Sequence, residues 1–288
     1  MSWISIECLA AADRHAALCE LLEDAGALSI TSLDAADRPV LEPAPGETPL
    51  WPQVRLTALF EGDYEPAALL ALLGAAGVQA LRCTSLADQD WARSGQDVQP
   101  RHFGNRLWVC PTGAAAPAPD ALVVQLDPGL GFGTGAHPTT ALCLRWLARN
   151  PPVGGEVIDW GCGSGILAVA AARLGARRVW ALDIDPQALA ATADNAARNG
   201  VADCLRVVPA DGLPAAVAAD LILANILAPV LVALAPQLLD ALRPGGALLL
   251  SGLLESQVPE VLAGFGTALR FEAPTIDQGW ACVKGIKR

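Results

Sequence analysis

A glycine-rich motif, VIDWGCGSGILAVAAARLG (157–175), constrains the fold of this chain more than any other stretch. Residues 156–160, with Val157, Ile158 and Trp160, predict a buried strand. Residues 166–174 predict a buried helix because they are apolar on nearly every side. A helix that begins directly after a turn points free N–H groups at whatever lies there. Glycine is required where the backbone takes a positive φ or approaches a ligand closely, and this predicts the turn at Gly161, Gly163 and Gly165.

Two kinds of ligand could bind at such a turn, a dinucleotide or S-adenosylmethionine. The dinucleotide fingerprint Gly-x-Gly-x-x-Gly requires a third glycine at position 166, where this chain has Ile166. Asp159 also ends the strand, and its charge would repel a pyrophosphate. S-adenosylmethionine carries no phosphate but has an ammonium and a sulfonium group, so a nearby carboxylate favours its binding. A turn that binds no ligand remains the alternative on this motif alone.

A second acid indicates a ligand that contains a ribose. The next predicted strand, Val179–Asp183, ends in an acid 22 residues beyond Gly161. An acid at this position of a strand-helix-strand unit accepts hydrogen bonds from ribose hydroxyls. Asp183 by itself would also fit a nicotinamide enzyme, but together with Asp159 and Ile166 it favours S-adenosylmethionine. The alternative role, a helix cap before Pro186, suits Asp185 better.

Composition excludes several classes of protein. The chain has 288 residues, of which 53% are hydrophobic, so one or two domains with a large core are expected. No uncharged apolar run reaches the ~18 residues that a membrane span needs, and the N-terminus lacks the basic region of a signal peptide. The eight cysteines form no Cys-x-x-Cys pair. We therefore expect reduced thiols, no metal site and a cytoplasmic protein.

Charge points to the kind of partner. The net charge is −11, lysine occurs only at positions 284 and 287, and no basic stripe is visible. Nucleic-acid-binding proteins usually carry such a basic footprint, so no direct nucleic-acid contact is expected. An acidic surface suits a basic protein partner. We expect no association with a membrane, and a monomer.

The order of predicted elements gives an α/β fold with two domains. Residues 1–87 predict strand-helix-strand-strand-helix-strand, which suggests a smaller ferredoxin-like N-terminal domain for substrate recognition. Residues 88–118 show no clean period and predict a linker. In residues 119–288 strands and helices alternate, which predicts a doubly wound, Rossmann-like sheet with its ligand at the carboxyl ends of the strands. The helices expected in this domain span residues 138–149, 166–174, 186–199, 229–242 and 256–264, and the strands span 121–126, 156–160, 179–183, 205–208, 220–224, 247–251, 269–272 and 280–286.

A second glycine-rich stretch, LDPGLGFGTGAHPTT, precedes the helix that starts at Pro138. Its alternating glycines predict a loop that folds over a ligand, with Phe132 as an apolar lid. Thr134 and Thr140 are predicted to donate hydroxyl hydrogen bonds to that ligand. A plain surface connection is the alternative, and His137 would then serve only to cap the helix.

These motifs resemble the ribosomal protein L-eleven (L11) methyltransferase family (PrmA), one of the seven-strand S-adenosylmethionine-dependent methyltransferases. The resemblance rests on DPGLGFGTGAHPTT, VIDWGCGSGIL, DIDPQAL, DNAARNG and ANILAPVL, and continues through LEPAPGETPLW and FGNRLWVCP. It covers nearly the whole chain. It implies that Thr140, Gly161, Asp183 and Asn225 contact S-adenosylmethionine or the transfer site.

The resemblance implies methylation of the N-terminal α-amine and of lysine amines on a basic ribosomal protein. Asn225 is expected to accept a hydrogen bond from the reacting amine. Many amino-methylating enzymes have Asn/Asp-Pro-Pro-aromatic here, whereas this chain has Asn-Ile-Leu-Ala, which predicts a wider pocket. An RNA or other nucleic-acid methyltransferase of the same fold and a non-catalytic binding protein are the alternatives. The acidic composition argues against the first, and the intact motif residues argue against the second.

Overall fold

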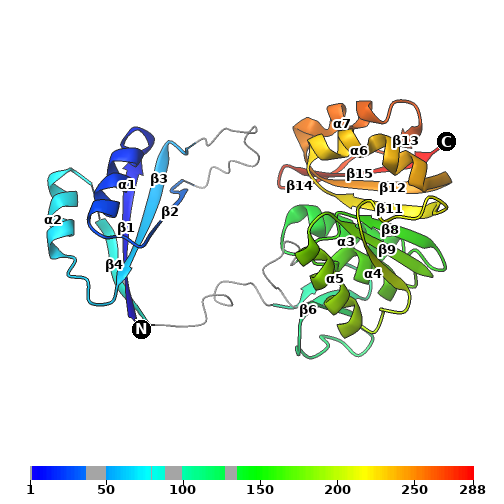
Figure 1. Ribbon diagram of the computed structural model, residues 1–288, viewed down its shortest axis with the longest axis horizontal. Helices are drawn as coiled ribbons and strands as arrows, with labels where there is room; N and C mark the ends of the chain where they lie inside the picture. The colour runs from blue at the N-terminus through cyan, green and yellow to red at the C-terminus, as the bar shows by residue number, and fades with distance from the viewer. Residues whose placement is uncertain (1, 37–49, 79, 88–98, 127–134) are drawn as a thin grey trace. The chain divides into compact units, whose positions relative to one another are not determined.

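The computed structural model describes residues 2–36, 50–78, 80–87, 99–126 and 135–288. The chain separates into two compact units with separate hydrophobic cores. Unit 1 comprises residues 1–94 and unit 2 comprises residues 95–288 (Figure 1).

Unit 1 is a four-stranded antiparallel sheet in the order β2-β3-β1-β4. Alternate side chains of β1 and β3 are buried, and leucines of both helices pack against this same face. This βαββαβ arrangement is the ferredoxin-like fold that the sequence predicts. Its elements are β1 (Ser2–Ala11), the 3-10 turn η1 (Ala12–Arg14), α1 (His15–Asp24), β2 (Ser29–Asp34), β3 (Gln53–Glu61), α2 (Ala67–Ala75) and β4 (Ala80–Ala87).

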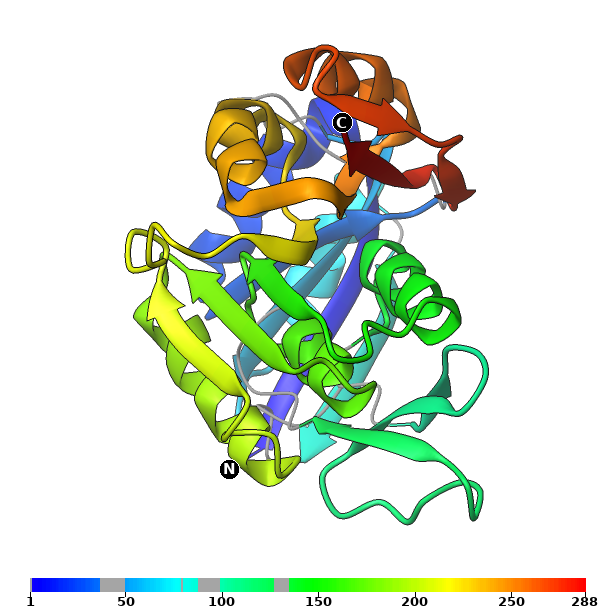
Figure 2. The same cartoon turned by 90° about the vertical axis from the view of Figure 1, so that its right-hand side faces the viewer.

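Unit 2 is built on an eight-stranded sheet in the order β10-β9-β8-β11-β12-β15-β13, with β14 paired to β15. Strands β8 to β12 are parallel, and β15 runs antiparallel to β12. Figure 2 shows β8, β9 and β10 side by side. The elements are α3 (Pro138–Arg149), β8 (Glu156–Trp160), α4 (Ile166–Arg173), β9 (Arg178–Asp183), α5 (Pro186–Arg198), β10 (Leu205–Pro209), β11 (Ala219–Asn225), α6 (Ala228–Ala241), β12 (Leu242–Leu254), η2 (Glu255–Gln257), α7 (Val258–Gly264), β13 (Leu269–Phe271), β14 (Thr275–Asp277) and β15 (Trp280–Lys287).

Both faces of this sheet are covered, as in other parallel sheets. Val157 faces a cluster that includes residues of α3, α4 and α5, whereas its neighbour Ile158 faces a cluster with α6 and α7. The strand order reverses between β8 and β11, because the chain proceeds from β8 through β9 to β10 and then returns to the other side of β8. In such sheets the carboxyl ends at this reversal form the ligand crevice.

The stretch predicted as a linker contains two strands. β5 (Arg101–His102) and β6 (Leu107–Pro111) join β7 (Leu122–Leu126) in a three-stranded sheet. Phe103 and Leu107 are buried in the same cluster as α3 and α4. The sequence showed no period here because β5 has two residues and β6 is buried at three of its five positions, so neither strand alternates.

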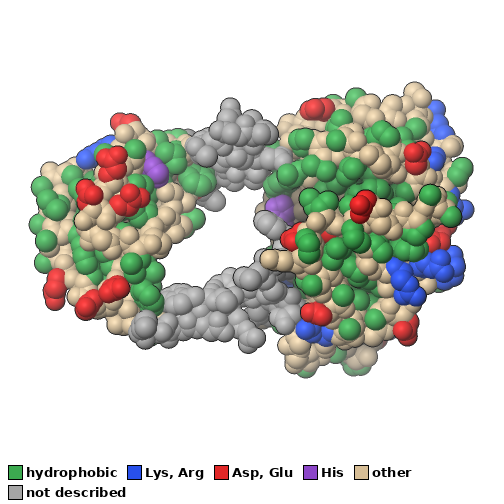
Figure 3. All heavy atoms as spheres, in the orientation of Figure 1, with side chains coloured by type: hydrophobic (Ala, Val, Ile, Leu, Met, Phe, Trp, Pro, Cys, Tyr) green, Lys and Arg blue, Asp and Glu red, His purple; other side chains and the backbone are tan. Residues whose placement is uncertain are grey.

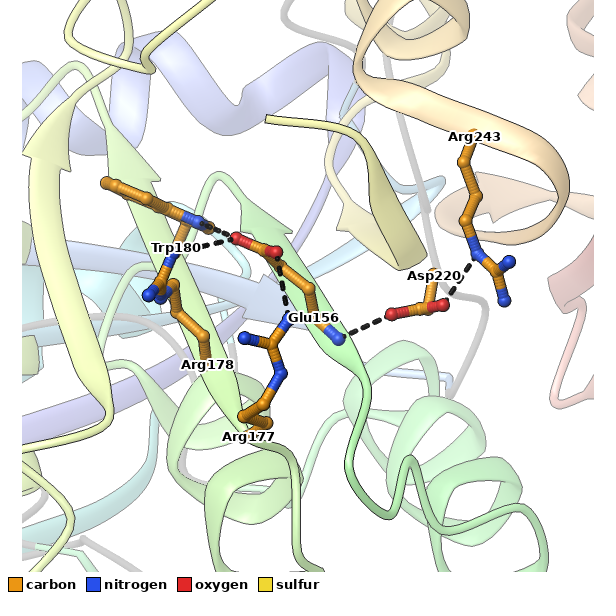
Figure 4. A network of polar contacts seen from close by, with 6 residues as sticks. All are labelled: Glu156, Arg177, Arg178, Trp180, Asp220 and Arg243. Carbon is orange, nitrogen blue, oxygen red and sulfur yellow. Dashed lines mark hydrogen bonds and ion pairs between the residues drawn. The ribbon is translucent and has the colours of Figure 1, made fainter. Parts of the chain in front are cut away.

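A polar network joins the amino ends of four neighbouring strands, β9, β8, β11 and β12, at the edge opposite their carboxyl ends (Figure 4). Glu156 of β8 accepts from Trp180 Nε1 at 2.8 Å, and its carboxylate also pairs with Arg177 and Arg178. The Glu156 backbone N–H donates to Asp220, which pairs with Arg243. Exposed ion pairs each add little to the free energy of unfolding. The part-buried hydrogen bonds from Trp180 Nε1 and from the Glu156 N–H link β8 to β9 and to β11. Among the described residues, no helix combines the length and apolarity needed to cross a membrane.

Candidate active site

The glycine turn after β8 is as sharp as the sequence predicts. Gly161, Gly163 and Gly165 all have positive φ, of 78°, 54° and 77°. The N–H groups of residues 161 and 162 both donate to the carbonyl of Leu182 in β9, at 2.8 and 2.9 Å. The turn is therefore fixed to the neighbouring strand.

Two of these glycines are also required by packing within the protein. A Cβ at Gly161 would collide with Ile226 Cγ2, from the segment that follows β11. A Cβ at Gly165 would lie 2.7 Å from both Cγ2 and Oγ1 of Thr192. Ile226 and Thr192 thus occupy the space that a side chain at position 161 or 165 would need. The sequence alone did not indicate this role for Ile226 or Thr192.

Asp183 lies at the tip of β9 and is half-buried. Its Oδ2 accepts from the Gly163 N–H at 2.9 Å, and its Oδ1 accepts from the Asp185 N–H at 3.0 Å. Each carboxylate oxygen has a second lone pair, which can accept a further hydrogen bond. Asp185 caps α5 by accepting from the Gln187 N–H at 2.9 Å, as the sequence suggested for this residue.

Asn225 and Thr140 meet although 85 residues separate them in the chain. Asn225 Nδ2 donates to Thr140 Oγ1 at 3.2 Å. This contact fixes the orientation of the amide, whose other polar atom is Oδ1. Within the described part of the chain, Asn225 Oδ1 is buried and has no hydrogen-bond partner. A buried acceptor without a partner is costly, and in native proteins it usually marks a place that a ligand or water fills.

Thr140 is held in place by the start of α3. His137 caps this helix by accepting from the Thr139 N–H, and Pro138 occupies the first turn. The His137 ring lies edge-on to Trp280, with 4.8 Å between ring centroids. Burial lowers the pKa of the His137 imidazole, which favours the neutral ring that a cap requires.

Asp159 is buried beneath the glycine turn, with only 1% of its surface exposed. Its Oδ2 accepts from the Ala168 N–H at 2.9 Å, whereas its Oδ1 has no partner among the described residues. Burial raises the pKa of Asp159 to about 7, and the charge of Asp183 acts in the same direction, against the Ala168 hydrogen bond. Burial likewise raises the pKa of the Cys162 thiol to about 12.

The structure brings five of the predicted site residues to the carboxyl edge of the sheet, and these are Thr140, Gly161, Gly163, Asp183 and Asn225. Phe132 and Thr134 lie outside the described residues, so the lid formed by Phe132 stays a prediction. No group of three or more His, Cys, Asp or Glu side chains in the described ranges is arranged to hold a metal ion.

Comparison with known proteins identifies the family. Residues 2–288 match the family described as Ribosomal protein L11 methyltransferase (PrmA). A ribosomal protein L11 methyltransferase of Azotobacter vinelandii is 48% identical over 295 residues, covering all of both chains. The protein of that name from Pseudomonas aeruginosa (strain LESB58) is 47% identical over 294 residues, with 100% and 99% of the two chains covered.

A solved structure agrees with this assignment. The crystal structure of a ribosomal protein L11 methylase from Lactobacillus delbrueckii subsp. bulgaricus is 32% identical and superposes with a TM-score of 0.59. The match covers 66% of this chain and 98% of that one. The full-length match, the identity and the shared fold together show that this chain belongs to the ribosomal protein L11 methyltransferase (PrmA) family of methyltransferases.

Proposed function

We propose that this enzyme transfers methyl groups from S-adenosylmethionine to amino groups of ribosomal protein L11, at its N-terminal α-amine and at lysines, in the cytoplasm. The observation that carries the proposal is the Asn225 amide. Thr140 holds its nitrogen, which leaves its buried oxygen as an acceptor for an amine N–H. The names of the relatives support L11 as the substrate, and the eight free thiols support a reducing compartment.

The residues of the crevice fit S-adenosylmethionine. The Asp183 carboxylate has lone pairs left for ribose hydroxyls, and the two glycines that flank Cys162 let a ligand approach the backbone. The carboxylate of Asp183, which lies beside the glycine turn, suits a ligand with an ammonium and a sulfonium group. When bound, this cofactor supplies an electrophilic methyl group.

The protein's own contribution is to place and orient the amine. An amine must be neutral to attack, and its ammonium form has a pKa of about 8 to 10 in water. A pocket of low dielectric disfavours the ammonium form, and the Asn225 oxygen accepts one N–H of the neutral amine. The amine's lone pair can then be aimed along the line of methyl transfer, and such alignment supplies a large part of the rate.

The experiment that tests this function is methyl transfer from labelled S-adenosylmethionine by the full-length protein. Purified L11 and ribosomal RNA are offered separately. We expect label in the protein and none in the RNA. Label in RNA alone would show that the acceptor is a nucleic acid, and label in neither would remove this chain from the active methyltransferases.

Removing the acid at the tip of β9 should weaken cofactor binding. We expect Asp183→Ala to raise the dissociation constant of S-adenosylmethionine about 10- to 50-fold, because charge-assisted hydrogen bonds to ribose contribute roughly 1.5–3 kcal/mol each before water compensates. Asp185→Asn is the matched control, because it keeps the α5 cap and should stay within about threefold of the wild-type constant. Unchanged affinity of Asp183→Ala in calorimetry would remove Asp183 from the site.

We further propose that unit 1 recruits the basic substrate. Residues 1–94 carry 14 Asp and Glu but only five Lys and Arg, whereas residues 95–288 carry 16 acids and 14 bases. The charge of the protein is thus concentrated in the smaller unit, and Figure 3 shows acidic side chains spread over its visible face. Opposite charge speeds association and fixes orientation.

Neutralising the exposed acids of α1 should weaken substrate recognition. We expect the triple change Glu20→Gln, Glu23→Gln and Asp24→Asn to raise KM for L11 roughly five- to tenfold at low salt, with kcat unchanged, because rim charges act mainly on encounter. The control neutralises three exposed acids of unit 2, Asp194, Asp203 and Asp240, each to Asn. Equal effects of the two triple variants on KM would show that only overall charge matters.

A further inference from the structure

Strand β12 contains a bulge beside the proposed transfer site. The pairing between β12 and β15 shifts register between Leu250 and Leu253. Gly252, inside this interval, has a φ of 80°. Ser251 pairs with Asn225 in the parallel ladder between β11 and β12, so the bulge lies next to the proposed transfer residue. Bulges of this kind occur beside active sites, where they redirect neighbouring groups.

The chain that leaves Asn225 passes directly over Gly252. A Cβ at Gly252 would lie 2.6, 2.8 and 2.9 Å from the O, N and C atoms of Ile226. These are backbone atoms, so no side-chain rotation can make room. The Ile226 side chain in turn fills the space above Gly161. Ile226 is therefore held between Gly161 of the glycine turn after β8 and Gly252 of the bulge.

The other residue of the bulge contacts the helix that carries Thr140. Ser251 is fully buried, and its hydroxyl lies 3.2 Å from the carbonyl oxygen of Thr139 and 3.1 Å from that of Ala281. One hydroxyl proton serves these two acceptors. Thr139 belongs to the first turn of α3, directly before Thr140. The bulge thus contacts both chain segments whose side chains form the Asn225–Thr140 hydrogen bond.

We propose that Ser251 and Gly252 are positioning residues for methyl transfer. Gly252 sets the position of the Asn225 amide through Ile226, and Ser251 sets the position of Thr140 through the Thr139 carbonyl. The two residues lie on β12, outside every motif that contacts the cofactor in the proposed site. This inference rests on the proposed role of Asn225, and its test separates the two.

The test compares alanine at two glycines of the same strand. Gly245 also lies in β12 and has a positive φ of 75°, but nothing lies within 4 Å of a Cβ added there. Both substitutions therefore put alanine in the same left-handed conformation, and only Gly252→Ala displaces Ile226. We expect Gly252→Ala to lower kcat about 30- to 100-fold, since a misplacement of about 1 Å can cost that much. The dissociation constant of S-adenosylmethionine and the KM for L11 should change far less, and Gly245→Ala should match the wild type.

Double-mutant cycles separate positioning from general damage. If Gly252 acts through the Asn225 amide, adding Gly252→Ala to Asn225→Ala should lower kcat little further, because the displaced group is already gone. The same holds for Ser251→Ala added to Thr140→Val, and this cycle decides the matter if Gly252→Ala does not fold. Losses of kcat that multiply in full in these cycles would overturn the inference. A wild-type kcat in Asn225→Ala would instead overturn the proposed role of Asn225.

Discussion

Replacing Asn225 by alanine should lower kcat about 100- to 1,000-fold, while the dissociation constant of S-adenosylmethionine stays within about threefold of the wild-type value. In the proposed mechanism the amide oxygen holds the amine in the direction of attack, so removing it should raise the free energy of the transition state more than that of the bound substrate. In the structure this oxygen is buried and without a partner among the described residues, while the amide nitrogen is held by Thr140. Single-turnover rates with both substrates bound measure the effect directly.

Thr140→Val is the graded control for this prediction. It keeps the shape of the side chain but removes the hydroxyl that accepts from Asn225 Nδ2. The amide keeps its oxygen but loses its orientation, so we expect a smaller loss of kcat, about tenfold. If Asn225→Ala turned over at the wild-type rate, another group would orient the amine and the transfer site would have to be reassigned.

Replacing Asp159 by asparagine should stabilise unit 2 at alkaline pH. The pKa of this carboxyl is raised from 3.8 to about 7, so the folded state keeps a proton that the unfolded state releases. As pH rises from about 4 to 7 the folded state therefore loses stability, and above pH 7 the penalty is constant. We therefore compare the free energy of unfolding of Asp159→Asn with that of the wild type at pH 5 and at pH 8. The difference between them should be roughly 2–3 kcal/mol larger, in favour of the variant, at pH 8, at about 1.36 kcal/mol per pH unit.

Unfolding of unit 2 must be followed separately, because two units need not unfold together. Hydrogen exchange of the core amides in β8, β9 and β11 reports on this unit alone. Asp194→Asn, which replaces an exposed acid of α5, is the control and should change stability equally at both pH values. An equal change for Asp159→Asn at pH 5 and pH 8 would show that its carboxyl carries no buried charge.

The sequence predicts the glycine turn and the elements around it well because their signals are local. The bounds of β8 and α3 are those predicted, since each is marked by a glycine turn or by proline at the helix start. The acids at the tips of β8 and β9 lie beside the turn because parallel strands bring their carboxyl ends together. Membership in the family also follows from these motifs, as the comparisons confirm.

Contacts made across the sheet could not be predicted from the sequence. Strand β12 begins at Leu242, before the Pro-Gly-Gly that predicted a break, because Leu242 pairs with Ala219 of β11. The short strand β14 depends on its pairing with β15 and was missed. Nothing local marks Ser251 or Gly252 as part of the proposed site, and the Asn-Ile-Leu-Ala motif does not reveal that Ile226 lies against Gly161 and Gly252. Their roles come from a close backbone approach and a buried hydroxyl between elements far apart in the chain.

The central claim, that the enzyme methylates amines, is tested most directly by mapping each methyl group on L11 by mass spectrometry after reaction with the full-length enzyme. Intact L11 is compared with L11 whose α-amine and lysines have been acetylated beforehand. We predict methyl groups on the α-amine and on lysines of intact L11, and none on the acetylated protein. Methyl groups on carboxylates or hydroxyls, or undiminished methylation of acetylated L11, would contradict the claim.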